Sequence, residues 1–183
     1  MRIAVICNSK TGFSKRYADW IADEISCCVQ PYKDLANIVA QDNEIVIFCS
    51  RVHAGKIEYL DRAKSHFNNR SRQTLIVVAT GATPVAAEKA IDRLWANNLS
   101  DIEIKSIPHF YLQGGLNYEK MGFVDRTIMK MVSWLMSRKR VKNDEEAGFE
   151  QAIKDSYDIS SKEHILPLLN YIKDIVPQSN TPT

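Results

Sequence analysis

Short apolar runs alternate along the chain with stretches in which hydrophobic residues recur every three or four positions. Apolar runs cover residues 2–7, 44–49 and 74–79, each of a length typical of a buried strand. A weaker run covers residues 29–32, and a fifth strand is expected within residues 103–112. Strands that alternate with helices favour a parallel β-sheet covered by helices on both faces.

Helical periodicity recurs in residues 14–26, 57–67, 85–99, 124–136 and 163–176. In the first of these segments, Tyr17, Ile21 and Ile25 follow one another at intervals of four. Pro167 must lie in the first turns of the last helix or kink it, because proline lacks the N–H that a helix interior uses.

The composition is that of an ordinary globular domain. The chain has 183 residues, of which 45% are hydrophobic and 25% charged. This length suits a single domain over residues 1–176, followed by a flexible tail at residues 177–183. No apolar run approaches the roughly 18 residues of a transmembrane helix, and a signal peptide is not evident, so a cytoplasmic location is expected. The net charge of +2 gives no indication of nucleic acid as a partner.

The four cysteines do not form the pattern of a metal site or of a disulfide framework. No C-x-x-C pair occurs, and Cys27 and Cys28 are adjacent. Cys7 and Cys49 lie near the ends of two predicted strands, where a small buried apolar residue is expected. We therefore expect no metal ion.

The turn between the first strand and the first helix is the strongest candidate site. It reads Ser9, Lys10, Thr11, Gly12, Phe13 and Ser14. Its hydroxyls precede a helix N-terminus, where backbone N–H groups and the helix dipole favour an anion, and its glycine permits close approach. Neither G-x-x-x-x-G-K-[ST] nor G-x-G-x-x-G occurs here, which disfavours a P-loop NTPase and a dinucleotide site. The alternative is that Ser14 or Thr11 only caps the helix.

This turn resembles the phosphate-loop signature of flavodoxins, S/T-x-T-G-x-S/T, and occupies the same place in the chain. The resemblance implies a three-layer α/β flavodoxin-like fold with a five-stranded parallel sheet in the order 2-1-3-4-5. It also implies FMN as cofactor, with its phosphate wrapped by the turn without a positive charge. Phe13 departs mildly from the pattern, because many flavodoxins have a polar residue there.

The resemblance further implies that the turns after strands three and four flank the isoalloxazine ring. The expected ring contacts are Arg51, Val52, His53, Ala54, Gly55, Lys56, Thr80, Gly81, Ala82 and Thr83. Gly55 and Gly81 would present backbone N–H groups, and Arg51 or Lys56 would stabilise negative charge on reduced flavin. His53 is the one candidate catalytic side chain, and its alternative is an ordinary loop histidine.

The two ring turns lack the tryptophan or tyrosine that is typical of flavodoxins. Tyr59, Tyr111 and Tyr118 are the alternatives nearby, and the sequence does not choose among them. The absence of aromatic residues from these turns and the presence of basic residues near the ring favour a flavoprotein that oxidises a substrate over a low-potential electron carrier.

Residues 113–131 carry a second resemblance. The pattern G-x-L-x-Y, followed by D-R-x-x-[MI]-[MI]-K-x-[MI], resembles the flavodoxin-like protoporphyrinogen dehydrogenase family and implies an additional helix after strand five. Those enzymes bind FMN, oxidise protoporphyrinogen IX and pass electrons to a membrane quinone. The loop at residues 80–84 is shorter than the basic loop of those enzymes.

Three functions follow as alternatives: an FMN-dependent oxidoreductase of this type, a flavodoxin-like electron carrier without its own substrate, and a module that has lost its flavin.

Residues 124–142 combine apolar positions with a basic cluster. They would serve for peripheral contact with the inner membrane face, for a homodimer patch, or as a packed helix with a solvated end. Arg126 and Lys130 would face a substrate carboxylate or solvent.

Overall fold

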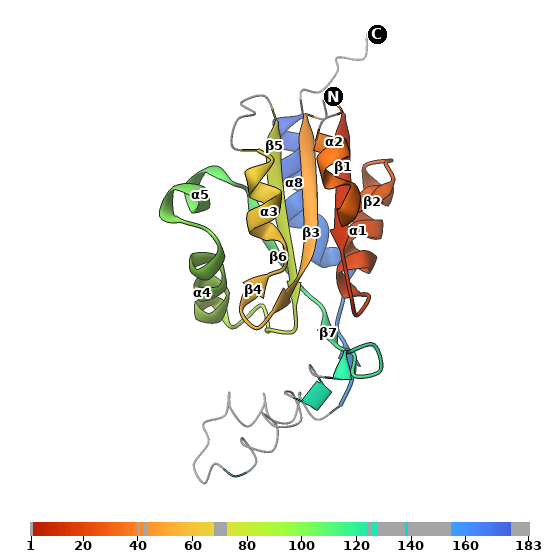
Figure 1. The fold of residues 1–183 in the computed structure, drawn as a ribbon, viewed down its shortest axis with the longest axis vertical. Helices are drawn as coiled ribbons and strands as arrows, with labels where there is room; N and C mark the ends of the chain where they lie inside the picture. Colours follow the sequence, from red (N-terminus) through yellow and green to blue (C-terminus); the bar gives the residue numbers. More distant parts are fainter. Residues whose placement is uncertain are drawn as a thin grey trace.

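The computed structural model describes residues 2–39, 41, 44–67, 73–123, 126–127, 138 and 155–176. Its central sheet has five parallel strands, namely β1 (Ile3–Asn8), β2 (Val29–Pro31), β3 (Ile45–His53), β5 (Thr74–Gly81) and β6 (His109–Gln113). Their spatial order is β2-β1-β3-β5-β6 (Figure 1). This is the predicted order 2-1-3-4-5, so the predicted fold class is confirmed.

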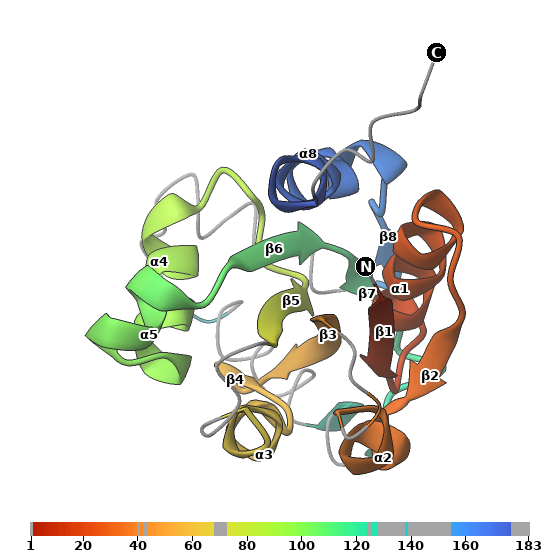
Figure 2. The same ribbon diagram turned by 90° about the horizontal axis from the view of Figure 1, so that it is seen from above.

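Helices cover both faces of the sheet (Figure 2). On one face lie α1 (Phe13–Glu24) and α8 (Leu166–Ile175), and on the other lie α2 (Leu35–Val39), α3 (Leu60–Ser65), α4 (Glu88–Asn98) and α5 (Asp101–Ser106). Successive side chains of a strand point to opposite faces, so Ile47 packs with α1 and α8 while Phe48 packs with the other helices. The sheet is therefore buried on both sides, as expected for parallel strands.

The fifth strand, which was expected within residues 103–112, occupies only the second half of that range and one residue beyond it. Residues up to Ser106 belong to α5, because Ser100 and Glu103 form a capping box. The Glu103 N–H donates to Ser100 Oγ at 3.3 Å, and the Ser100 N–H donates to Glu103 Oε2 at 2.8 Å. Only His109–Gln113 is strand.

Two predicted helices begin later than their periodicity indicates. The helix expected from residue 57 begins at Leu60, because β4 (Lys56–Ile57) pairs with the end of β3 in antiparallel fashion. The helix expected from residue 85 begins at Glu88. Two short 3₁₀ helices, η1 (Tyr32–Asp34) and η2 (Lys162–Ile165), precede α2 and α8. Pro167 lies in the first turn of α8, as predicted.

A second small sheet lies beyond the carboxyl end of the main one (Figure 1). It consists of β7 (Gly115–Leu116) and β8 (Tyr157–Asp158), which pair in antiparallel fashion. In the sequence, residues 117–156 connect β7 to β8. The expected helix at residues 124–136, the basic cluster and the tail at residues 177–183 lie outside the described residues, apart from Arg126, Thr127 and Arg138. No helix in the described part of the chain is long and apolar enough to cross a membrane.

Candidate functional site

The sheet register brings the predicted turns to one edge. Asn8 is aligned with Ser50, Arg51 with Thr80, and Gly81 with Gln113. The ends of β1, β3, β5 and β6 therefore lie next to one another. Ligands of doubly wound α/β domains bind outside this carboxyl edge.

Gly12 shapes the turn between β1 and α1. It has φ +100°, a left-handed conformation that glycine adopts without strain, and it is the N-cap of α1. Its N–H donates to Ser9 Oγ at 3.2 Å, and its carbonyl accepts from the Arg16 N–H at 3.0 Å. Because the cap residue is glycine, neither Ser14 nor Thr11 occupies the capping position that the alternative interpretation required.

Two hydroxyl groups near this edge are buried without a hydrogen-bond partner. Ser14 is 1% exposed and Thr80 is 3% exposed, and neither Ser14 Oγ nor Thr80 Oγ1 has a partner among the described residues. An unsatisfied buried polar group costs about 1–3 kcal/mol. An oxygen-rich ligand at the α1 N-terminus would offset that cost, so the residues present fit a phosphate group.

A groove of about 350 Å³ lies beside the turn. Its lining consists of Cys7, Ser9, Lys10, Gly12, Lys15, Val29, Gln30, Pro31 and Lys120. Burial raises the pKa of the Cys7 thiol to about 12, so this thiol is neutral and unreactive at physiological pH. The lining contains three lysines and no carboxylate, which favours an anion.

Phe13 packs against the ends of the neighbouring strands. A methyl group built at Gly114 would lie 3.0 Å from Phe13 Cβ and 3.2 Å from Thr80 Cγ2. Phe13 itself is 8% exposed. This packing explains an apolar residue at the position where many flavodoxins have a polar one.

The first predicted ring turn is tighter than the sequence indicated. Residues 50–53 belong to β3, and the turn itself is only Ala54 and Gly55. Both residues have positive φ, +48° and +75°, which is typical of a two-residue hairpin turn.

The charge of Arg51 is balanced by Glu58, a residue that the sequence analysis missed. Arg51 Nε donates to Glu58 Oε2 at 2.7 Å, and its Nη2 donates to the other carboxylate oxygen. Asn8 Nδ2 donates to the same Glu58 Oε2 at 3.1 Å, and Ser50 Oγ donates to the Glu58 carbonyl at 2.8 Å. The edge therefore holds a half-buried bidentate ion pair. No motif spacing marks Glu58 in the sequence.

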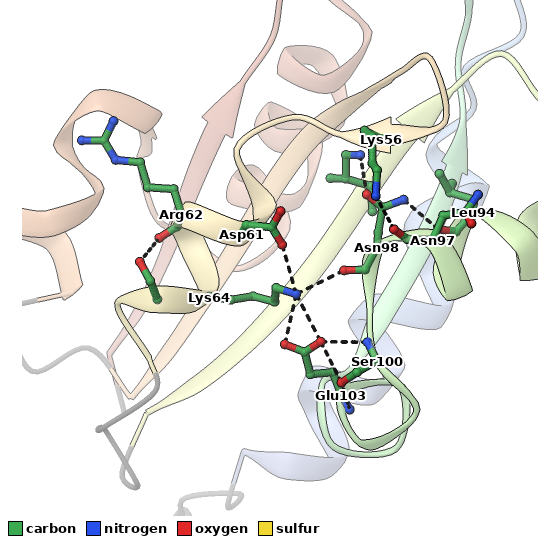
Figure 3. A network of polar contacts seen from close by, with 11 residues as sticks. Lys56, Asp61, Arg62, Lys64, Leu94, Asn97, Asn98, Ser100 and Glu103 are labelled. Atoms are coloured by element: carbon green, nitrogen blue, oxygen red, sulfur yellow. Dashed lines mark hydrogen bonds and ion pairs between the residues drawn. The ribbon is translucent and has the colours of Figure 1, made fainter.

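Lys56 and Gly55 are held by the end of α4. Lys56 Nζ donates to the Asn97 carbonyl at 2.6 Å, and Asn98 Nδ2 donates to the Gly55 carbonyl at 2.9 Å. Figure 3 shows these contacts beside Lys64, which bonds both the Asn98 carbonyl and Glu103. The position of the first ring turn is therefore tied to the junction of α4 and α5.

Two tyrosines hold the second ring turn through its backbone. Tyr111 Oη donates to the Thr83 carbonyl at 2.9 Å, and Tyr157 Oη donates to the Ala82 carbonyl at 3.2 Å. Burial raises the pKa of Tyr111, so its hydroxyl remains a donor at neutral pH. Tyr157 was not among the residues that the sequence singled out.

The other candidate aromatics have different surroundings. The Tyr59 ring stacks on Tyr32 with centroids 4.5 Å apart and is 52% exposed. The Tyr118 N–H donates to Ser156 Oγ at 2.9 Å, which places Tyr118 at the base of the segment after β7. His53, which ends β3, is half-buried.

The ion pair predicts a pH dependence of stability. Burial alone would raise the pKa of Glu58, but hydrogen bonds from Arg51 and Asn8 lower it below its ordinary value. Its contribution to the unfolding free energy is therefore present above the ordinary glutamate pKa of about 4.3 and is lost as pH falls through the lowered pKa. We expect Glu58→Gln to lower the unfolding free energy at pH 7 by about 1–3 kcal/mol.

Urea denaturation of the wild type and of Glu58→Gln between pH 7 and pH 3 measures this effect. The difference between the two proteins should shrink toward the acid end. Asp92→Asn, at an exposed position of α4, is the matched control and should leave the profile unchanged. A Glu58→Gln profile parallel to that of the wild type would contradict the assignment.

The fold is that of a doubly wound α/β domain, in which the turn after β1 leads into the N-terminus of α1 at the carboxyl edge of the sheet. The chain belongs to the flavodoxin domain family, whose model matches residues 4–143. Among the described residues, no group of three His, Cys, Asp or Glu side chains lies in position to hold a metal ion.

Two solved structures are similar to the domain. The Trp repressor binding protein from Bacillus subtilis aligns with a TM-score of 0.41 at 14% identity, over 77% of this chain and 100% of its own. A protein from Bacteroides uniformis described as a flavoprotein aligns with a TM-score of 0.41 at 13% identity, over 70% and 97%. No curated protein is significantly similar in sequence.

Proposed function

We propose that the protein binds FMN at the carboxyl edge of its sheet and acts as an FMN-dependent oxidoreductase. The observation that carries the proposal is the Ser14 hydroxyl, which is buried without a partner in the first turn of α1. It follows Gly12, whose left-handed conformation opens the helix N-terminus to an anion. Membership of the flavodoxin domain family supports a flavin as the ligand.

The residues of this chain would hold the two ends of the cofactor separately. Ser9, Thr11, Gly12 and Ser14 would bind the phosphate, with the backbone of residues 54–55 and 82–83 beside the ring. FMN supplies hydride and electron transfer when it is bound. Tyr111 and Tyr157 fix the backbone of the second ring turn, which orients any group bound beside it.

The charge at this edge is largely balanced within the protein. Because Arg51 is paired with Glu58, the pair contributes a fixed dipole rather than a full positive charge toward the ring. His53 ends β3, two residues after Arg51, and it is the candidate for moving a proton at this edge.

The finer proposal concerns the substrate. The pattern in residues 113–131 supports protoporphyrinogen IX as the electron donor and a quinone as the acceptor. Most of that pattern's second half lies outside the described residues. A flavodoxin-like carrier is the second candidate, and family membership favours it equally.

Titration of the apoprotein with FMN and with riboflavin, followed by flavin fluorescence, tests cofactor binding. We expect FMN fluorescence to be quenched stoichiometrically and riboflavin to bind much more weakly. The reason is that the turn would bind the phosphate group, which riboflavin lacks. Ser14→Ala should weaken FMN binding about tenfold through the loss of one hydrogen bond, about 1.4 kcal/mol, and should leave riboflavin binding unchanged.

Ser106→Ala, at an exposed position of α5, is the matched control and should bind FMN as the wild type does. Absence of FMN binding by the wild type would overturn the proposed function. Oxidation of protoporphyrinogen above its autoxidation rate, with FMN and a quinone present, separates the enzyme from the electron carrier.

A further inference from the structure

A lysine from the segment after β7 lies over the phosphate turn. A methyl group built at Gly12 would lie 3.7 Å from Lys120 Nζ. Lys120 also lines the same groove as Ser9 and Gly12. The flavodoxin signature in residues 9–14 contains nothing that predicts a cation from this distant part of the chain.

The backbone that carries Lys120 is a well-bonded turn. The Lys120 N–H donates to Asn117 Oδ1 at 3.0 Å, and the Met121 N–H donates to the Asn117 carbonyl at 3.1 Å. Arg126 Nη2 donates to the Glu119 carbonyl at 3.3 Å. Lys120 therefore extends from a base that its neighbours fix, which lowers the entropy lost when its ammonium group binds an anion.

The turn that carries Lys120 is also held by the residue that directly precedes β8. The Tyr118 N–H bonds to Ser156, and Ser156 directly precedes β8. In β8, Asp158 forms an ion pair with Arg16 on α1, the helix that begins at the phosphate turn. The turn that carries Lys120 is thus connected to α1 through Ser156 and β8.

The charges of the groove are unevenly balanced. Lys15 is paired with Asp19 one helical turn further along α1. The groove lining itself contains no acidic residue, so an anion there would meet Lys120 without a competing carboxylate in the wall. An ammonium group beside a phosphate forms a charge-assisted hydrogen bond, which is about twice as strong as a neutral one.

We propose that Lys120 binds the terminal phosphate of the flavin and thereby selects the phosphorylated form of the cofactor over the unphosphorylated one. The inference rests on the proposed function. It adds a positive charge from a distant segment to the N–H groups, the hydroxyls and Lys10 of the turn itself. It also makes the segment after β7 part of the cofactor site.

The test measures dissociation constants for FMN and for riboflavin with the full-length apoprotein at low and high salt. Lys120→Ala should weaken FMN binding about tenfold to hundredfold and leave riboflavin binding unchanged. Raising the ionic strength should weaken FMN binding to the wild type more than to Lys120→Ala, because screening acts on the charge that the variant lacks. Inorganic phosphate should compete with FMN less effectively in the variant.

Lys120→Arg should keep most of the selectivity, because it keeps the charge. Lys105→Ala, at an exposed position of α5, is the matched control and should behave as the wild type. Thermal unfolding of Lys120→Ala without flavin should match the wild type, since Lys120 is exposed.

The outcomes separate the inference from the function on which it rests. If the wild type binds neither flavin, the proposed function fails. If the wild type prefers FMN and Lys120→Ala keeps the same preference and salt dependence, the proposed function stands and the role of Lys120 is wrong. An equal loss of affinity for both flavins would also overturn that role, because it would indicate a contact away from the phosphate.

Discussion

Replacing Tyr17 with alanine should lower the unfolding free energy by about 3–5 kcal/mol, the range for a large buried aromatic residue. Tyr17 is fully buried, and its ring meets Trp20 edge to face with centroids 5.4 Å apart. Its hydroxyl donates to the Gln113 carbonyl, lies 2.7 Å from His164 Nδ1 and accepts the Ser161 N–H at 3.3 Å. Alanine removes both the packing and this junction between α1, β6 and η2.

Tyr17→Phe separates the two contributions. It keeps the ring and removes only the hydroxyl, which leaves the Ser161 N–H and the Gln113 carbonyl without this partner, at about 1–3 kcal/mol. Urea denaturation of the flavin-free protein measures both variants. Tyr171→Phe, whose ring packs against Phe110, is the control and should change stability by less than about 0.5 kcal/mol. A Tyr17→Ala protein within about 1 kcal/mol of the wild type would refute the role of this junction.

The second large effect is expected at Gly115. A methyl group built there would lie 2.0 Å from the Tyr157 carbonyl oxygen and 2.9 Å from its carbon. These are backbone atoms of the paired strand, so β7 and β8 must separate to admit even alanine. We expect Gly115→Ala to cost about 1–3 kcal/mol, as overpacking does, and to weaken flavin binding, because Tyr157 also holds Ala82 in the second ring turn.

Gly55→Ala provides the comparison for this variant. Gly55, unlike Gly115, has a positive φ, but a methyl group there would meet nothing within 4 Å. Its cost should be limited to backbone strain, about 1 kcal/mol. Thermal unfolding and riboflavin titration of both variants measure the contrast. If Gly115→Ala proves as stable as Gly55→Ala, the close approach of β7 and β8 does not exist in solution.

Hydrophobic pattern was sufficient to predict most of the sheet. The runs that became β1, β3 and β5 are continuous and strongly apolar because they are buried on both faces. The sheet order needed more than pattern, since it came from the resemblance of residues 9–14 to a known phosphate turn. The helix that follows that turn was predicted to within two residues because Tyr17 and Ile21 mark its buried face.

Pattern failed where a local interaction overrides alternation. Ile102 and Ile104 alternate with charged residues as in a half-buried strand, yet the Ser100–Glu103 capping box starts a helix, and Ile102 is 79% exposed. The short strand β4 carries too few residues for any period to show. Pairing with β3 and the turn at Ala54 and Gly55 set its conformation instead.

The structure brings the predicted turns to one edge of the sheet, but the residues that contact these turns were not predicted. Residues on the turns were found because short hydroxyl and glycine motifs are visible in the sequence. The missed residues, Glu58, Tyr157 and Lys120, lie beside residues far from them in the chain, such as Asn8 for Glu58 and Ala82 for Tyr157. A single sequence carries no marker of such pairings.

The paired strands β7 and β8 also bear on how a domain of this kind changes over evolution. The chain departs at Leu116 and returns at Tyr157, two residues that face each other in the small sheet. Because the exit and entry points are adjacent, the length of the connection between them has little effect on the main sheet, and doubling a loop costs only about 0.6 kcal/mol in closure entropy. The carboxyl edge is therefore a permissive insertion point, where a lineage can exchange one connecting segment for another and keep the doubly wound domain unchanged.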